Sequence, residues 1–296
     1  MSKSVTNGST RIAITMGDPR GIGPEIIAKA LRRKDILRLG EFILIGDSRL
    51  LPKSKATVID IAYRSPGEGS LKFLEKAVGL IKSGIADALV TAPLSKEAVH
   101  HYKKNFRGHT EYLAENFDVK NFDMMFVSPQ LRLSLVTRHV SLKDIPKRIT
   151  KSSVFSSIEL MHKTLKQKFG VTSPSIAVLG LNPHAGEGGL LGQEEIKYII
   201  PAIKLAQQKG IKAQGPFPAD TFFARDIGFD GVVAMYHDQG LAPIKGLFFK
   251  DLVNFTAGLP FVRTSPVHGT AFNIAGRGIA DPSSMIAAIK LAFQLA

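Results

Sequence analysis

The sequence contains no cysteine and no tryptophan among its 296 residues. The lack of cysteine excludes disulfide bonds, thiolate metal ligands and a cysteine nucleophile. No apolar run reaches the length that a membrane-spanning helix needs. The first ten residues, MSKSVTNGST, are polar and lack the apolar core of a signal peptide. Together these absences predict a cytoplasmic protein with no membrane partner.

Three common functional motifs are also missing. The chain has no G-x-x-x-x-G-K-[ST], which excludes a P-loop NTPase. It has no G-x-S-x-G, the nucleophile elbow of many hydrolases. The segment Gly21-Ile22-Gly23 lacks the third glycine of the Rossmann fingerprint for dinucleotides. Motifs alone therefore identify no cofactor.

Positive charge is what the chain has in excess. The formal net charge is +14, from 39 lysines and arginines against 25 aspartates and glutamates. Such an excess can serve nucleic-acid binding. The basic residues, however, form only short clusters, such as 53–55, 103–104 and 163–168, without an aromatic-interleaved stripe. We expect a solvated basic surface or the attraction of an anionic small substrate, and no nucleic-acid partner.

Strand-like and helix-like runs alternate along the chain, which predicts an α/β fold with a largely parallel sheet. The strand-like runs are 11–18, 41–47, 87–93, 123–128, 131–139, 175–180, 231–238 and 252–258. The helix-like runs are 24–33, 70–84, 144–169, 194–210 and 283–296. The close spacing of 123–128 and 131–139 favours an antiparallel pair. Ser70 is a candidate N-cap for the helix that Gly84 ends.

Three histidines, His139, His184 and His237, lie at the ends of three predicted strands. Ligands bind at the carboxyl ends of strands in such folds. Neutral imidazole is a common ligand of zinc, cobalt and iron. Each histidine alone would be read as structural, but together, beside glycine or carboxylate neighbours, they predict one shared metal ion. Asn182 and Glu187 are candidates to orient His184.

A second group of residues is suited to an anionic substrate. The GHTE segment (108–111) opens a predicted helix, whose first N–H groups could hold an anion. Lys245, Asn254 and Arg263 would suit a carboxylate or phosphate, although Lys245 could equally belong to a surface salt bridge. Asp220 lies between apolar residues that could raise its pKa and make it a base, or it could cap a helix.

Several blocks of the sequence closely resemble the 4-hydroxythreonine-4-phosphate dehydrogenase family of vitamin B6 synthesis. The resemblance runs from about residue 11 to the C-terminus. The blocks are GHTEYLAE, GLNPHAGEGG with GQEE, GPFPADTFF, AMYHDQGLAPIK and GLPFVRTS with HGTAFNIAGRG.

The resemblance implies the fold of isocitrate and isopropylmalate dehydrogenases, with two α/β domains and a cleft between them. The first domain would comprise 1–108 and 264–296, and the second 109–263. This fold binds NAD(P) without a Rossmann domain, which accounts for the missing fingerprint. The family is a homodimer in which each active site borrows a metal ligand from the partner subunit.

The resemblance also implies roles for individual residues. The family's three metal-binding histidines map onto His139, His184 and His237. The divalent metal ion that they hold would be zinc, magnesium or cobalt. Substrate contacts map onto His109, Thr110, Lys245, Asn254 and Arg263. Segment 265–282 resembles the adenosine-binding loop of isopropylmalate dehydrogenases and makes Gly269 and Asn273 candidate cofactor contacts. Asn273 replaces an acidic residue that can bind the ribose of NAD, so either NAD or NADP is allowed.

The implied activity is a metal-dependent, NAD(P)-linked oxidation of 4-phosphooxy-L-threonine at C3, followed by decarboxylation to 3-amino-2-oxopropyl phosphate. Asp220 and Asp238 are the candidate bases. The alternative substrates are 4-phospho-D-threonate and 4-phospho-D-erythronate, which carry a hydroxyl group in place of the amine. A non-catalytic metal- or nucleic-acid-binding protein is the alternative from another class, and the metal and substrate positions argue against it.

Overall fold

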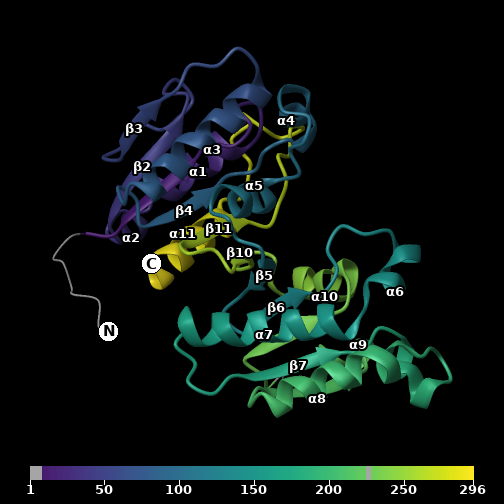
Figure 1. Ribbon diagram of the computed structural model, residues 1–296. Helices are drawn as coiled ribbons and strands as arrows, with labels where there is room; N and C mark the ends of the chain where they lie inside the picture. Colours follow the sequence, from purple (N-terminus) through teal and green to yellow (C-terminus); the bar gives the residue numbers. More distant parts are fainter. Residues whose placement is uncertain (1–8, 225–227) are drawn as a thin grey trace. The chain divides into compact units, whose positions relative to one another are not determined.

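The computed structural model describes residues 9–224 and 228–296 (Figure 1). Residues 1–8, most of the polar N-terminal stretch, and 225–227 lie outside the described residues. The chain divides into two compact units, one comprising the part up to Phe117 together with Pro260–Ala296, the other Asp118–Leu259. The predicted boundaries, 108/109 and 263/264, fall before helix α5 (His109–Asn116) and inside strand β11 (Val262–Pro266), both of which lie in the first unit.

The first unit is built on a parallel sheet with the strand order β3-β2-β1-β4-β11. The central strands are buried along almost their whole length, as in β4, which explains their continuous apolar runs. The remaining strands of this unit are β1 (Arg11–Thr15), β2 (Glu41–Gly46), β3 (Thr57–Asp60) and β4 (Ala88–Thr91).

Helices α1 (Gly23–Leu31), α2 (Lys34–Leu37), α3 (Pro66–Lys82), α4 (Lys96–Tyr102) and α11 (Ser283–Leu295) complete this unit with α5. Helix α11 packs on β11 and β4 beside α1, and α3 packs on β1 and β2 beside α4 (Figure 1).

Helix α3 begins four residues earlier than the predicted start at Ser70. Its N-cap is Ser65, whose Oγ accepts the Glu68 N–H at 3.3 Å, followed by Pro66 at the first helical position. Proline suits that position because its fixed φ is helical and its missing N–H would have no partner there. Ser70 is instead buried one turn into the helix, where its hydroxyl donates to the Pro66 carbonyl at 2.8 Å. Gly84, at φ +68°, follows the end of the helix as predicted.

The second unit contains a mixed sheet with the order β10-β5-β6-β9-β7-β8. Strand β5 runs antiparallel to both β6 and β10, and the pairs β6–β9, β9–β7 and β7–β8 are parallel. The predicted antiparallel pair, 123–128 with 131–139, is confirmed as β5 and β6. A connection this short can join only antiparallel neighbours. The strands are β5 (Asp123–Val127), β6 (Arg132–Leu135), β7 (Ser175–Leu179), β8 (Lys212–Phe217), β9 (Gly231–Ala234) and β10 (Val253–Ala257).

Helices cover both faces of this second sheet. A Cβ at Gly231 would meet Met161 of α7 (Lys151–Gln167), whereas a Cβ at Gly240 of α10 (His237–Phe248) would meet Ala234. Positions 231 and 234 point to opposite faces of a strand, so α7 and α10 lie on opposite sides of β9. The other helical segments are η1 (Leu142–Asp144), α6 (Ile145–Arg148), η2 (Pro183–Gly189), η3 (Glu195–Ile199), α8 (Ile200–Gln208) and α9 (Ala219–Phe222).

Candidate functional site

Two of the three predicted metal ligands lie side by side in the second unit. His139 follows β6 and His237 follows β9, and these strands are parallel neighbours. The centroids of the two imidazole rings are 5.7 Å apart, close enough for one ion to contact a nitrogen of each ring. The rings help to line a pocket of about 210 Å³, which is also lined by Arg138, Val140, Leu142, Ile145, Tyr236 and Asp238.

Asp238 holds the imidazole of His237 in one orientation. The His237 Nδ1 lies 2.6 Å from the Asp238 Oδ1. A carboxylate that accepts the Nδ1–H leaves the Nε2 lone pair available, and metal-binding histidines are commonly held in this way. The pair therefore fits two ligands of a divalent metal ion. Because Asp238 bonds to a predicted ligand, its position suits orientation of His237 better than proton abstraction from a substrate.

His184 lies elsewhere in the same unit, on the η2 segment after β7, where it is exposed. Within residues 9–224 and 228–296, no group of three or more histidines and carboxylates is placed to hold a metal ion. A single chain therefore does not assemble the three predicted ligands. The η2 segment contacts α9, which carries Asp220. Asp220 is exposed in the first turn of α9, whose N-cap is Pro218, so it does not cap that helix.

The backbone around His184 is left-handed over consecutive residues. The φ values are 52° at His184, 52° at Ala185, 81° at Gly186, 43° at Glu187 and 66° at Gly188. Non-glycine residues in this conformation cost about 1–2 kcal/mol each, because Cβ crowds the backbone. Such a loop needs strong anchors elsewhere in the structure.

The anchor is Glu195, a buried carboxylate that the sequence reasoning did not single out. Its Oε1 accepts the backbone N–H groups of Leu181 and Asn182 at 2.7 and 2.8 Å, and its Oε2 accepts the Asn182 side-chain amide at 2.9 Å. Asn182 also donates to Glu194 at 2.8 Å. Asn182 thus holds the loop through these two glutamates, and Glu187, the other residue predicted to orient His184, is exposed.

In the first unit, His109 and Thr110 form the first turn of α5 behind Gly108, an N-cap without a side chain. The first N–H groups of a helix without a capping side chain are available to an anion. Burial, followed by the charges of Arg263 and Lys96, lowers the pKa of His109 well below its ordinary value. His109 is therefore neutral near pH 7 and can donate or accept a hydrogen bond.

Arg263 lies in β11, a strand whose residues are all buried, and is itself almost fully buried. Its Nη2 donates to the Thr91 Oγ1 at 2.6 Å, and Thr91 ends the neighbouring strand β4. Burial lowers the pKa of Arg263 to about 10, so the side chain stays protonated near neutral pH. A buried cation close enough to His109 to depress its pKa suits an anionic ligand.

The two other predicted substrate residues lie in the second unit. Asn254 is in β10, and its Oδ1 is buried without a hydrogen-bond partner among the described residues. Such an atom is costly unless a donor, for example from a ligand, reaches it. Lys245 is half-buried in α10, and no described carboxylate lies within ion-pair distance of it. The surface salt bridge considered for Lys245 is therefore absent from the described part of the chain.

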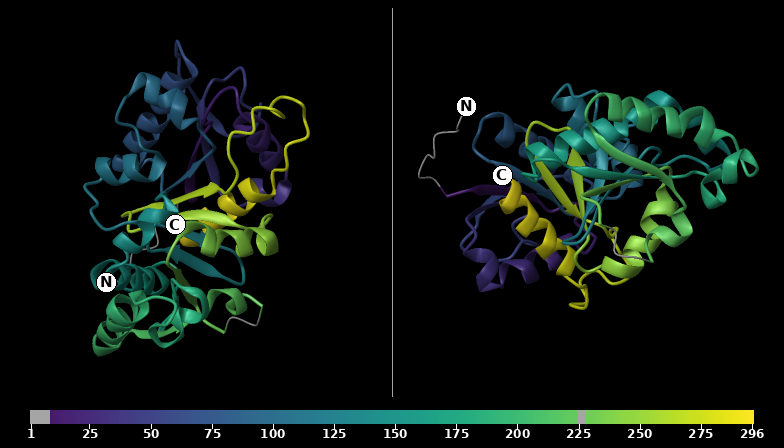
Figure 2. Two further views of the ribbon diagram at one scale, coloured as in Figure 1. Left: turned by 90° about the vertical axis from the view of Figure 1, so that its right-hand side faces the viewer. Right: turned by 90° about the horizontal axis from the view of Figure 1, so that it is seen from below.

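Segment 265–282, the predicted adenosine-binding loop, is fastened to α1 and to the turn before it. The Ile22 N–H donates to the Thr270 carbonyl at 3.0 Å. The Glu25 carboxylate accepts the N–H groups of Gly278 and Ala280 at 3.2 and 2.8 Å. Lys29 donates to the carbonyls of the same two residues at 2.9 and 2.6 Å. Figure 2 shows this yellow loop lying beside the purple N-terminal helix.

The loop leaves space and polar atoms for a ligand. Gly269 and Asn273, the predicted cofactor contacts, are both exposed, and a Cβ at Gly269 would meet no described atom within 4 Å. The His268 Nε2 is buried without a partner among the described residues. Next to Asn273, Phe272 helps to line a pocket of about 480 Å³, which is also lined by Arg20, Ser65, Pro66, Gly67, Ser95, Glu97, Ala98, His101 and Tyr102.

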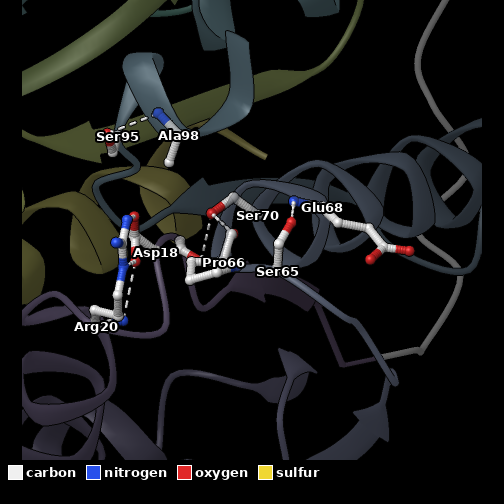
Figure 3. A network of polar contacts seen from close by, with 9 residues as sticks. Asp18, Arg20, Ser65, Pro66, Glu68, Ser70, Ser95 and Ala98 are labelled. Carbon is white, nitrogen blue, oxygen red and sulfur yellow. Dashed lines mark hydrogen bonds and ion pairs between the residues drawn. The ribbon is translucent and has the colours of Figure 1, made fainter. Parts of the chain in front are cut away.

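This pocket combines aromatic rings with a cation and hydroxyl groups, which is the chemistry that a nucleotide needs. The Arg20 side chain is held by the buried carboxylate of Asp18, as Figure 3 shows with the serine caps of α3 and α4. The described residues of the first unit therefore fit a dinucleotide at loop 265–282.

Comparisons with known proteins place the chain in a family. The family model described as pyridoxal phosphate biosynthetic protein PdxA matches residues 45–292. The chain belongs to this family. A 4-hydroxythreonine-4-phosphate dehydrogenase of Sulfurihydrogenibium sp. is 40% identical over 316 residues, covering 96% of this chain and 98% of the relative. A protein of Oceanobacillus iheyensis, provisionally named D-threonate 4-phosphate dehydrogenase, is 43% identical over 324 residues and covers 96% and 97%.

Solved structures agree with the family and with the predicted fold class. The crystal structure of 4-hydroxythreonine-4-phosphate dehydrogenase from Klebsiella pneumoniae has a TM-score of 0.86 and 36% identity, covering 98% of this chain and 99% of that chain. An isocitrate dehydrogenase from Methylococcus capsulatus, at 14% identity and a TM-score of 0.52, shares the fold, covering 94% and 83%.

The resemblance, the isocitrate dehydrogenase-like fold and the classification as a dehydrogenase are thereby confirmed. A dehydrogenase family implies a nicotinamide cofactor, and the PdxA family acts in vitamin B6 biosynthesis. None of the helices in the described ranges is both long and apolar enough to span a membrane.

Proposed function

We propose that the chain is a metal-dependent dehydrogenase that oxidises 4-phosphooxy-L-threonine at C3 with NAD or NADP and forms 3-amino-2-oxopropyl phosphate by decarboxylation. The observation that carries the proposal is the pair of imidazoles, His139 and His237, held 5.7 Å apart at the ends of neighbouring strands. Relatives about 40% identical along nearly the whole chain carry the corresponding name, which supports the choice of substrate.

We infer that the enzyme works as a homodimer with shared metal sites. His139 and His237 supply two ligands from one copy, and the exposed His184 loop of the other copy supplies the third. This arrangement accounts for a histidine on a strained, well-anchored loop that has no companion ligands among the described residues of its own chain. A zinc, magnesium or cobalt ion held there supplies Lewis-acid chemistry at an oxygen of the substrate.

Both units contribute residues that would bind the anionic groups of the substrate. In the first unit, Arg263 and the N-terminus of α5, with His109 and Thr110, bind one anionic group of the substrate. In the second unit, Lys245 binds the other anionic group. The Asn254 Oδ1, which has no partner among the described residues, accepts a hydrogen bond from a donor on the substrate. A phosphorylated hydroxy acid carries two anionic groups, a phosphate and a carboxylate, which matches two separate cationic sets.

Asp220 is the remaining candidate for the base, because Asp238 already accepts from His237. Its exposed carboxylate lies on α9, against the η2 segment that carries His184. There it would take the proton of the C3 hydroxyl group while the hydride leaves C3 for the nicotinamide. The loop 265–282, with Gly269 and Asn273, holds the cofactor that accepts the hydride.

A second candidate function keeps this chemistry and changes the substrate to 4-phospho-D-threonate or 4-phospho-D-erythronate. The observation that favours it is the 43% identity to the Oceanobacillus relative. These substrates carry a hydroxyl where 4-phosphooxy-L-threonine carries an amine. Assaying all three compounds with NAD and with NADP, by the appearance of the reduced cofactor, decides between the two functions.

The shared metal site is tested by mixing two inactive variants. We expect His139→Ala and His184→Ala each to lose bound metal and turnover. If each site takes His139 from one copy and His184 from the other, a mixed dimer contains one intact site. Random reassociation of equal amounts then restores about a quarter of the wild-type activity. If all ligands came from one chain, the mixture would stay inactive, and unchanged metal content in His184→Ala would overturn the assignment.

A further inference from the structure

The first unit contains the same Asp-X-Arg turn twice, at the ends of two neighbouring parallel strands. Asp18-Pro19-Arg20 follows β1, and Asp47-Ser48-Arg49 follows β2. In both turns the aspartate is buried and accepts the backbone N–H of the arginine at 3.0 Å. The guanidinium then donates to both carboxylate oxygens, at 3.1 and 3.0 Å for Arg20 and at 2.9 and 2.7 Å for Arg49.

The surroundings of the two arginines differ. The Arg49 side chain is 83% exposed and lines neither pocket described above. The Arg20 side chain is 55% exposed, and its guanidinium carbon lies 5.2 Å from the centroid of the Phe272 ring. Arg20 therefore connects the turn after β1 to loop 265–282, and both side chains line the pocket of about 480 Å³. Neutralising a buried aspartate explains the position of Arg49, but it does not explain the stacking of Arg20.

The Arg20 guanidinium retains hydrogen-bonding capacity on its other edge. A guanidinium has five N–H groups, and Asp18 accepts one from Nε and one from Nη2. No other acceptor for this side chain lies within hydrogen-bonding distance in the described part of the chain. The group is fixed by Asp18 on one side and by the Phe272 ring on another. A planar donor held in this way binds phosphate with little loss of conformational entropy.

We propose that Arg20 is a cofactor-binding residue whose guanidinium donates to the pyrophosphate of the dinucleotide in this pocket. The proposal rests on the proposed dehydrogenase function and adds a residue to its cofactor site. The pyrophosphate is chosen over the 2′-phosphate of NADP because Glu97 lines the same pocket. A carboxylate there repels the more highly charged monoester, whereas it can accept a ribose hydroxyl group. Arg20 thus contacts a group that NAD and NADP share.

The two turns provide a matched pair of variants, Arg20→Ala and Arg49→Ala. Each removes the same local ion pair, so a purely structural role predicts similar effects on cofactor binding in both. We expect Arg20→Ala to weaken the binding of NADH and of NADPH alike, roughly tenfold to a hundredfold, as for one charge-assisted hydrogen-bonding group. Arg49→Ala should bind both cofactors within about twofold of the wild type. Binding is measured by the fluorescence of the reduced cofactor, without substrate.

Two further variants keep the test decisive if Arg20→Ala does not fold. Arg20→Lys keeps the charge but loses the planar guanidinium that donates to both Asp18 oxygens. Phe272→Leu keeps the ion pair between Arg20 and Asp18 but removes the aromatic ring. Both should fall between Arg20→Ala and the wild type in affinity. Equal binding by the Arg20 variants and Arg49→Ala would overturn the proposal, and so would a loss confined to NADPH.

The same measurements separate this proposal from the proposed function. A wild-type protein that binds NADH but oxidises none of the phosphorylated hydroxy acids overturns the proposed function, while the comparison of Arg20 and Arg49 variants still decides the role of Arg20. A wild-type protein that is active while Arg20→Ala binds NADH normally overturns only the role of Arg20. A wild-type protein that binds neither reduced cofactor overturns both.

Discussion

Removal of the Glu195 carboxylate tests how the His184 loop is held. In Glu195→Ala, the backbone N–H groups of Leu181 and Asn182 lose the oxygen that accepts both, and the Asn182 amide loses one of its two acceptors. A buried donor left without an acceptor costs about 1–3 kcal/mol. Two partly buried N–H groups therefore predict a loss of about 2–4 kcal/mol in the free energy of unfolding.

Glu195→Gln should be milder, because the amide oxygen can still accept both backbone N–H groups. Its NH₂ group would then face the donating amide of Asn182, so one hydrogen bond is lost and the expected cost is about 1 kcal/mol. Under the proposed shared metal site, both variants should also lower the bound metal, since Glu195 holds the backbone that leads into the left-handed segment at His184. The order of the two variants in stability follows directly from the contacts of each carboxylate oxygen.

The measurement is urea unfolding followed by circular dichroism, because the chain has no tryptophan to report by fluorescence. Glu187→Ala is the matched control, since it removes an exposed carboxylate from the same loop and leaves a non-glycine residue at the same positive φ. That control should change stability by no more than about 0.5 kcal/mol. If Glu195→Ala and Glu187→Ala lose the same stability, Glu195 does not anchor the loop.

Two further predictions concern pH and the α5 N-terminus. Burial raises the pKa of Asp123 to about 6, whereas an unfolded chain titrates near pH 4. The folded state thus holds this proton more tightly, so the contribution of Asp123 to stability should fall as pH rises from about 4 to 7. Asp123→Asn should flatten that slope in urea unfolding across pH, and an unchanged slope would contradict the burial argument. In Gly108→Ala, the new Cβ would lie 3.1 Å from the Glu111 Oε2 and 3.2 Å from the Lys96 Cε. Steady-state kinetics should show a KM for the phosphorylated substrate raised several-fold, unlike in Gly210→Ala, where the Cβ meets no described atom within 4 Å and KM should not change.

The strands that the sequence predicted are mostly buried and rich in apolar residues. Parallel strands such as β1 and β4 appear as continuous apolar runs, because helices or loops cover each side. Three strands, β3, β8 and β11, have no counterpart among the predicted runs. Strand β11 is buried throughout, but its sequence, VRTSP, is largely polar. Strands β3 and β8 lie at the ends of their sheets and are mostly exposed. Their sequences therefore carry little hydrophobic periodicity.

Helix α10 was missed for a different reason. Gly240, Pro243 and Gly246 interrupt its sequence, and local propensity alone argues against a helix there. Tertiary packing overrides that propensity, because Gly240 lets the helix approach Leu133 and Ala234 closely. A Cβ at this glycine would lie 2.8 Å from a Leu133 methyl group, so the residue that weakens the helix also permits its packing.

The sequence predicted those site residues that come directly after a strand-like run. His139 and His237 could be named from their positions after strand-like runs, but the adjacency of β6 and β9 depends on topology. Glu25 and Glu195 gave no such signal, because a glutamate on a helix is ordinarily solvated. The Glu25 carboxylate accepts the backbone N–H of Gly278, 253 positions away. Because every residue except proline has a backbone N–H, the identity of residue 278 gives no sign of this contact.

The division of the chain into a contiguous unit and a discontinuous one has a consequence for biosynthesis. The second unit, Asp118–Leu259, is complete once its last strand and the residues just after it have left the ribosome. The first unit cannot add β11 to β4, or cover it with α11, until residues 262–295 have been made. Since domains generally fold as units during synthesis, the second unit should fold first. Glu25 and Lys29 are synthesised early and remain without their partners at Gly278 and Ala280 until those two residues have been made.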